Sequence, residues 1–111
     1  MKTRQAAVYV NDIWAGVLSQ EPGRYLFAYD AAYLAAPDLP AVSLSLPKSQ
    51  RLHLAPVLFP FFSGLLAEGT NLSLQARVLR IDERDDFSLL LATAGQQTIG
   101  AVTVRELAET P

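Results

Sequence analysis

The chain has 111 residues, of which 50% are hydrophobic and 18% charged, and its formal net charge is −2. A chain of this length holds one hydrophobic core, so we expect a single domain over residues 1–111. Eleven acidic residues outnumber nine basic ones, which argues against direct binding of nucleic acid or of a membrane surface. No signal peptide, cysteine or run of about 18 apolar residues is recognisable. These features predict a cytoplasmic protein without disulfides.

An antiparallel meander is predicted for the first part of the chain. Apolar residues alternate over Ala6–Val10 and again over Ile13–Leu18. Asn11 and Asp12 between them tolerate the positive φ of a tight hairpin turn. A second turn at Glu21–Gly23 leads into a third strand over Arg24–Tyr29, whose aromatic residues share one face.

The middle of the chain predicts one short helix and one more strand. Asp30 can cap a helical turn over Ala31–Leu34, which ends before Pro37. Alternation over Val42–Leu46 predicts a fourth strand, which Pro47 ends. A polar loop is expected to follow.

The second half of the chain predicts helices and a last strand. Apolar residues recur at helical spacing over Pro56–Leu66, over Leu72–Leu79 and over Phe87–Ala94. Asn71 is a candidate cap for the second helix, and Asp82 and Asp85 have the spacing of a capping box before the third. Ile99–Val104 predicts the last strand. The predicted fold class is α+β: an antiparallel sheet of about five strands with three to four helices packed on one side.

Few residues suggest catalysis or cofactor binding. His53 is the only histidine, and no second histidine or cysteine can join it in a metal site, so we expect no metal. Glu83 and its acidic neighbours Asp82, Asp85 and Asp86 could support a small acid-catalysed hydrolase, but acids at a helix start more often satisfy free N–H groups. No phosphate-binding glycine motif is present. The sequence therefore predicts a protein that is not an enzyme and that needs no cofactor.

Trp14 is the only tryptophan in the chain. Its position is out of phase with Ile13, Ala15 and Val17, which predicts burial beneath another element. An exposed tryptophan would instead indicate a binding hot spot.

Four segments resemble a known family, in the family's order. Residues 8–18 (VYVNDIWAGVL), 43–47 (SLSLP), 61–69 (FFSGLLAEG) and 85–102 (DDFSLL, then TIGAV) are similar to motifs of HipA-type proteins. The family pattern has glycine in place of Asp12 and proline in place of Ala67. Together the segments resemble the N-terminal subdomain of HipA kinases, and the sequence stops at Pro111, before the kinase core that would be expected next.

The resemblance implies a function through partners. A stand-alone subdomain of this kind is similar to the HipS-like antitoxins of three-component HipBST toxin–antitoxin systems. It implies an antitoxin-like binding protein that neutralises a HipT-type or HipA-type serine/threonine kinase toxin by direct contact. A HipB-like DNA-binding protein is the expected third partner. The alternative is a non-inhibitory subunit that completes a split HipA-like kinase.

The predicted kinase-binding segment is the FFSGLLAEG stretch. Phe61 and Leu65 are four positions apart, as are Phe62 and Leu66, so the two pairs lie on neighbouring stripes of a helix. We expect one pair to lie in the core and the other nearer the partner, with Leu65, Leu66 and Glu68 favoured as contacts. The complete prediction for the kinase contact is Phe61, Phe62, Leu65, Leu66, Glu68 and Gly69, with Trp14 as the second candidate.

Overall fold

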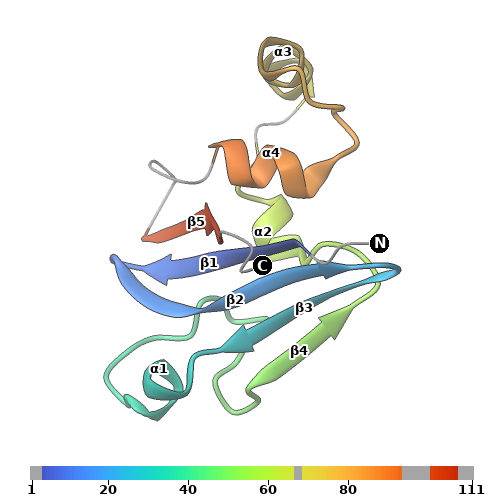
Figure 1. Cartoon of the computed structure of the whole chain (residues 1–111). Coiled ribbons are helices and arrows are strands. Elements are labelled where there is room, and N and C mark those ends of the chain that lie inside the picture. Colours follow the sequence, from blue (N-terminus) through green and yellow to red (C-terminus); the bar gives the residue numbers. More distant parts are fainter. Residues whose placement is uncertain (1–3, 67–68, 94–100, 108–111) are drawn as a thin grey trace.

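The computed structural model describes residues 4–66, 69–93 and 101–107. Its centre is one antiparallel sheet of five strands in the order β4-β3-β2-β1-β5 (Figure 1). The first three strands form the predicted meander, and the last strand returns to pair with the first. The strands span Arg4–Val10 (β1), Ile13–Glu21 (β2), Arg24–Tyr29 (β3), Leu52–Ala55 (β4) and Val102–Glu106 (β5).

The first hairpin combines a tight turn with a bulge. Asn11 and Asp12 have φ values of 50° and 65°, as their side chains permit. Val8 pairs with Gly16 but Tyr9 pairs with Trp14, so β2 carries one extra residue between these pairs. A bulge of this kind changes the direction of the side chains near the turn.

Four helices accompany the sheet, and those that contact it lie on one side, as predicted. They span Ala31–Ala35 (α1), Pro60–Ser63 (α2), Gly69–Leu79 (α3) and Asp86–Thr93 (α4). Figure 1 shows α2 and α4 next to the sheet and α3 beyond α4. The predicted cap at Asp30 is confirmed, because its carboxylate accepts a hydrogen bond from the Tyr33 amide. Of the two acids with capping-box spacing, Asp85 caps α4 by accepting from the Ser88 amide, whereas Asp82 lies before the helix and accepts from the Arg84 amide.

The core lies between one face of the sheet and helices α2 and α4. Phe27 of β3 is fully buried, and its ring lies 5.9 Å from the Phe62 ring of α2. The Tyr25 ring lies 6.2 Å from that of Phe87 in α4. Leu18, the neighbour of Phe27 on β2, is also fully buried. Apolar burial on this face therefore holds the two helices against the sheet.

The predicted strand over Val42–Leu46 is wrong. These residues form a turn, in which the Leu46 amide donates to the Ser43 carbonyl over 3.0 Å. The fourth strand is instead Leu52–Ala55, where His53 faces the core and Leu52 and Leu54 face away. Only four residues long, it alternates too briefly to stand out in the sequence.

The helix boundaries also differ from the prediction. The expected helix over Pro56–Leu66 is confined to Pro60–Ser63, because Pro60 lacks the amide proton that an earlier start would need. The second helix begins at Gly69, so Asn71 lies inside it and does not cap it. The expected last strand begins at Val102, and residues 99 and 100 lie outside the described residues. Within the described ranges, no helix has the length and apolarity to cross a membrane.

Candidate functional site

The segment predicted to bind the kinase divides into a buried and a partly exposed pair. Phe62 is fully buried and Leu66 is also buried, whereas Phe61 and Leu65 remain partly exposed. This confirms that one pair belongs to the core. The choice of Leu66 as a contact is not supported in this conformation, because its side chain packs inside the domain. Glu68 lies outside the described residues, and Gly69 is the first residue of α3.

Trp14 is exposed, so the prediction that it is buried is wrong. Its side chain is 47% exposed, and its indole Nε1 donates to the Gly16 carbonyl over 3.0 Å. The cause is the bulge in β2, which sets Trp14 opposite Tyr9 and turns it away from the helices. Because exposed tryptophans are enriched at binding hot spots, the position of Trp14 indicates a binding surface.

The face of the sheet that points away from the helices is largely apolar. We call it the outer face, and the pairing registers place on it eight apolar residues, Ala7, Tyr9, Trp14, Val17, Leu26, Ala28, Leu52 and Leu54, together with Gln5, Ser19, Thr103 and Arg105. Leu52 and Leu54 are 43% and 56% exposed, so the outer face is open beside the edge strand β4. Antiparallel sheets usually present polar residues to water on their uncovered face. An apolar uncovered face therefore indicates a contact surface.

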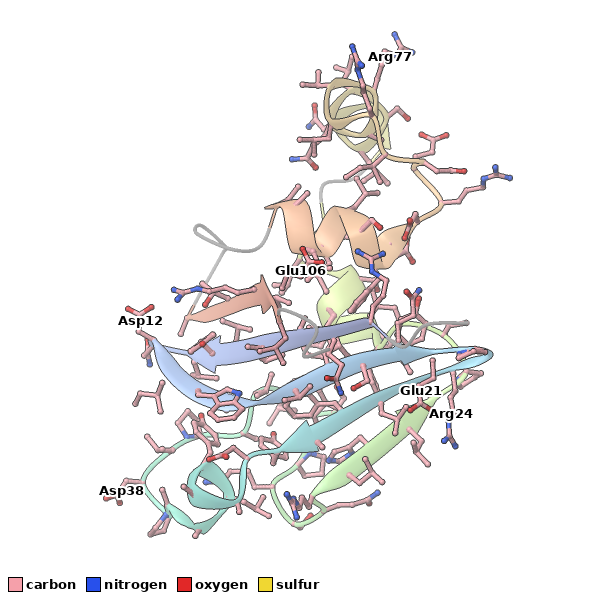
Figure 2. All side chains as sticks on the ribbon, viewed as in Figure 1. Asp12, Glu21, Arg24, Asp38, Arg77 and Glu106 are labelled. Atoms are coloured by element: carbon pink, nitrogen blue, oxygen red, sulfur yellow. The ribbon has the colours of Figure 1, made fainter. Side chains whose placement is uncertain are left out.

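Among the described residues, the charged side chains of the outer face belong to its turns and to the edge strand β5, where Arg105 lies over the Tyr9 ring at 4.7 Å. Arg24 and Glu21 form an ion pair of 2.8 Å at the turn between β2 and β3. Arg105 and Asp12 approach to 3.5 Å at the opposite margin. Figure 2 labels Glu21 and Arg24 at one end of the sheet and Asp12 at the other. The arrangement of an apolar centre and a polar rim is typical of protein–protein interfaces.

A second apolar surface lies on α3. Leu74 and Val78 are 52% and 79% exposed, and with Leu79 they line a groove of about 450 Å³ between α3 and α4. Gln75 also lines this groove, and its Oε1 accepts no hydrogen bond from any described residue. The groove is shallow and open, and none of its lining side chains is charged.

The turn over residues 42–46 is held by hydrogen bonds to the buried side chain of Tyr29, and we call it the anchored turn. The Tyr29 hydroxyl accepts from the Val42 amide over 3.0 Å and donates to the Leu46 carbonyl, so it joins both sides of the turn. Val42 and Leu46 are buried, whereas Leu44 at the tip is fully exposed. The exposed residue at the tip is therefore flanked by two buried residues.

More distant side chains fix the loops on both sides of the anchored turn. Lys48 Nζ donates to the Ala36 and Leu39 carbonyls over 2.6 and 2.9 Å. The Tyr33 hydroxyl donates to the Pro40 carbonyl over 2.6 Å. His53 Nε2 lies 2.9 Å from the Gln50 carbonyl and 3.1 Å from that of Pro47. Two acceptors at this nitrogen mean that it carries the proton.

Alkaline pH should test the burial of Tyr29. Burial raises the pKa of Tyr29 above its usual value, the Val42 amide opposes this, and nearby Tyr33 adds to it. The unfolded chain then loses this proton more readily than the folded one, so the free energy of unfolding is unaffected below about pH 10 and falls as pH rises further. We expect urea unfolding curves between about pH 8 and pH 11 to show a shallower fall for Tyr29→Phe than for the natural chain. Equal slopes would contradict this account.

The acidic cluster has structural partners. Asp82 pairs with Arg84 over 3.0 Å, and hydrogen bonds from Arg84 hold the pKa of Asp82 below its usual value. Glu83 accepts from the Ser73 hydroxyl over 2.7 Å, and Asp85 accepts from that of Ser88 over the same distance. This favours the helix-start interpretation over an acid pair for hydrolysis. No group of three or more metal-ligating side chains occurs among residues 4–66, 69–93 and 101–107.

Comparison with known proteins identifies the family. The model of the HipA N-terminal domain family matches residues 6–105. The chain belongs to this family. A solved structure of the N-terminal domain of HipA toxin superposes on this HipA N-terminal domain with a TM-score of 0.73 and 27% identity, covering 96% of this chain and 95% of that one. An uncharacterized protein of Haemophilus influenzae is 33% identical over 103 residues, which is 93% of this chain and 92% of that protein.

The family assignment confirms the fold and the resemblance found in the sequence. The five-stranded antiparallel sheet and its helices have the architecture of the HipA N-terminal domain. The outer face and the anchored turn were not predicted. An isolated exposed leucine leaves no signal in the sequence, and the outer face depends on the register of the bulged hairpin.

Proposed function

We propose that this HipA N-terminal domain is an antitoxin-like binding protein that neutralises a HipT-type or HipA-type serine/threonine kinase by direct contact. Its membership of a family named for a toxin domain supports a role in a toxin–antitoxin system. The observation that carries the proposal is the apolar outer face, with Trp14, Leu52 and Leu54 exposed on it. A domain of a larger kinase packs against the rest of that kinase, and a surface left open in a separate chain can bind it in trans.

The outer face has the composition of an interface centre. Tryptophan is enriched among residues that dominate binding energy, and a surrounding rim of polar groups excludes water from such a centre. Trp14 and Leu54 occupy the exposed parts of two strands of the same face. Phe61 and Leu65 on the helical side provide less exposed area, so we assign them a secondary role at most.

The proposed mechanism is binding without catalysis. A contact that forms only with an inactive arrangement of the kinase shifts the population towards that arrangement. We also propose that a HipB-like DNA-binding protein joins the two in a ternary complex, because the acidic balance of this chain gives it little affinity for DNA of its own.

Co-expression with the kinase tests the proposal. The natural chain should restore growth to cells poisoned by a HipA-type kinase, and Trp14→Asp combined with Leu54→Asp should abolish that rescue. Each aspartate would have to lose its hydration inside the interface, which we expect to weaken binding at least about 100-fold. Growth curves and pull-down of the kinase provide the two measurements.

A matched variant controls for the general effect of adding charge. Val78→Asp introduces one charge at a more exposed apolar site on α3, and it should leave rescue intact. If Val78→Asp abolishes rescue and the double variant does not, the kinase contact lies on α3 instead. Binding without growth rescue, together with undiminished kinase activity, would favour the non-inhibitory subunit that completes a split kinase.

A further inference from the structure

The two edge strands of the sheet, β4 and β5, differ in chemistry. Strand β5 carries the exposed charged side chains of Arg105 and Glu106. Strand β4 carries the exposed side chains of Leu52 and Leu54, and it contains no acid, lysine, arginine, proline or bulge. In Figure 1, no described helix or strand lies beyond β4. Charges, prolines and bulges are the usual protection of an edge against pairing, so β4 is an edge on which another strand can pair.

The register between β4 and β3 decides which backbone groups face the free edge. The Tyr29 amide of β3 donates to the Arg51 carbonyl over 3.0 Å. Hydrogen-bonded pairs recur at every second residue of an antiparallel ladder, so His53 also directs its amide and carbonyl towards β3. The amides and carbonyls of Leu52 and Leu54 therefore point outward, away from β3.

These outward groups are complementary to a second copy of the same strand. An antiparallel copy centred on His53 places Leu52 opposite Leu54 of the copy, and Leu54 opposite Leu52 of the copy. Each of the two pairs exchanges two backbone hydrogen bonds. The pairing ends beyond them, because the next outward residue is Pro56, which has no amide proton. Gln50 Nε2 already donates to the Leu52 carbonyl over 2.7 Å, but a carbonyl oxygen can accept a second hydrogen bond.

The side chains of two copies also match. Leu52 and Leu54 lie on the outer face of each copy, and directly opposite residues have Cβ atoms about 4.5–5.5 Å apart, so each leucine covers exposed surface of another. Arg51 comes opposite Ala55 of the second copy, so no like charges face each other along the strand. A two-fold axis at His53 therefore satisfies the backbone groups and the apolar side chains together.

We infer that two copies of this chain associate through β4, as a two-fold dimer in which the two sheets become one. The outer faces of the copies then lie side by side in the joined sheet. The inference goes beyond the proposed function and does not depend on the kinase. A contact of so few residues falls among the smallest specific interfaces, so we expect a weak dimer with a dissociation constant on the order of 100 µM.

Sedimentation of the purified chain tests the dimer. The natural chain should shift from monomer to dimer between about 5 µM and 1 mM. Leu54→Pro removes an outward amide that makes no bond to β3, so it should raise the dissociation constant at least tenfold. Leu44→Pro is the matched control, because it changes an exposed leucine at the second position of a turn, where proline is favoured. It should leave the dissociation constant unchanged.

Disulfide formation tests the register and does not need the proline variant to fold. The natural chain has no cysteine, so an introduced one has no competitor. Opposite residues of a hydrogen-bonded pair have Cα atoms about 5.5 Å apart, within the range of a disulfide, whereas two copies of one position would lie about 8–9 Å apart. A mixture of Leu52→Cys and Leu54→Cys chains should therefore form the mixed disulfide at least tenfold faster than either variant links to itself.

Each of three results would overturn the inference. They are a natural chain that stays monomeric at about 1 mM, a dimer that Leu54→Pro does not weaken, and self-linked disulfides that form as fast as the mixed one. A monomeric chain that loses kinase binding on Leu54→Pro would place a strand of the kinase on this edge instead of a second copy. A monomeric chain that still restores growth would overturn the dimer and leave the proposed function intact.

Discussion

Replacing Phe62 with alanine should lower the free energy of unfolding by about 3–5 kcal/mol, the range for truncating a buried phenylalanine. Phe62 is fully buried, and its ring lies 5.9 Å from that of Phe27 and 5.3 Å from that of Phe61. Helix α2 has only four residues, so this side chain is its principal attachment to the sheet. Small domains are stable by about 5–15 kcal/mol, so the loss would consume much of the total. Urea unfolding followed by far-ultraviolet circular dichroism would measure it.

The neighbouring Phe61 is a natural control for this prediction. It has the same side chain in the same helix but is partly exposed. Phe61→Ala should therefore lower the free energy of unfolding clearly less than Phe62→Ala, because the Phe61 ring is already partly in contact with water. Equal losses for the two variants would mean that α2 does not pack against the sheet as described.

Gly16→Val should lower the free energy of unfolding by a similar amount to Phe62→Ala, for a different reason. A Cβ atom at Gly16 would lie 2.3 Å from the Ala28 carbonyl oxygen and 3.0 Å from the Tyr29 Cα. Both atoms belong to the backbone of β3, which pairs with β2 at this point, so the strands would have to separate. We expect a loss of at least about 3 kcal/mol, the upper end of the usual cost of overpacking. Thermal unfolding or the yield of folded protein would show it.

Gly23→Ala tests whether the close approach of the strands is the cause. Gly23 has a φ of 78°, but a Cβ atom there would meet nothing within 4 Å. Its cost should be limited to backbone strain of about 1–2 kcal/mol. If Gly16→Val lowered the free energy of unfolding no more than Gly23→Ala, steric conflict between β2 and β3 would be excluded as the dominant effect.

The meander could be predicted because its signals are local. Alternating residues define β1 and β3, and Asn11 and Asp12 adopt the positive φ values that their side chains tolerate. The caps at Asp30 and Asp85 were predictable for the same reason, since each acts within three residues. Family motifs in the same order then made the overall architecture predictable.

The anchored turn could not be predicted because its cause is tertiary. Val42, Leu44 and Leu46 alternate as a strand would, and two of the three are indeed buried. The Tyr29 hydroxyl, thirteen or more positions earlier in the chain, bends the segment into a turn and leaves Leu44 outside. No local pattern encodes that contact.

The position of Trp14 depends on one inserted residue. Strand side chains alternate with a period of two, so an extra residue in β2 reverses the face of every position between it and the turn. Periodicity alone assigned Trp14 to the interior, and the bulge moves it to the outer face. The sequence could thus predict that the contact residues are large apolar side chains. Predicting the face of the sheet on which they lie would have required the register of the strands.

The pairing of β5 with β1 affects how the chain folds. Val104 pairs with Val8, whereas the strands of the β1–β2–β3 meander are joined by short turns. Closing the long loop between β1 and β5 costs more chain entropy than closing a hairpin, so we expect β5 to join after the meander. Until it does, β1 would offer unpaired amides and carbonyls along an apolar strand, where another unfolded chain can pair. We therefore expect the pairing of β5 to protect this edge of the sheet from aggregation.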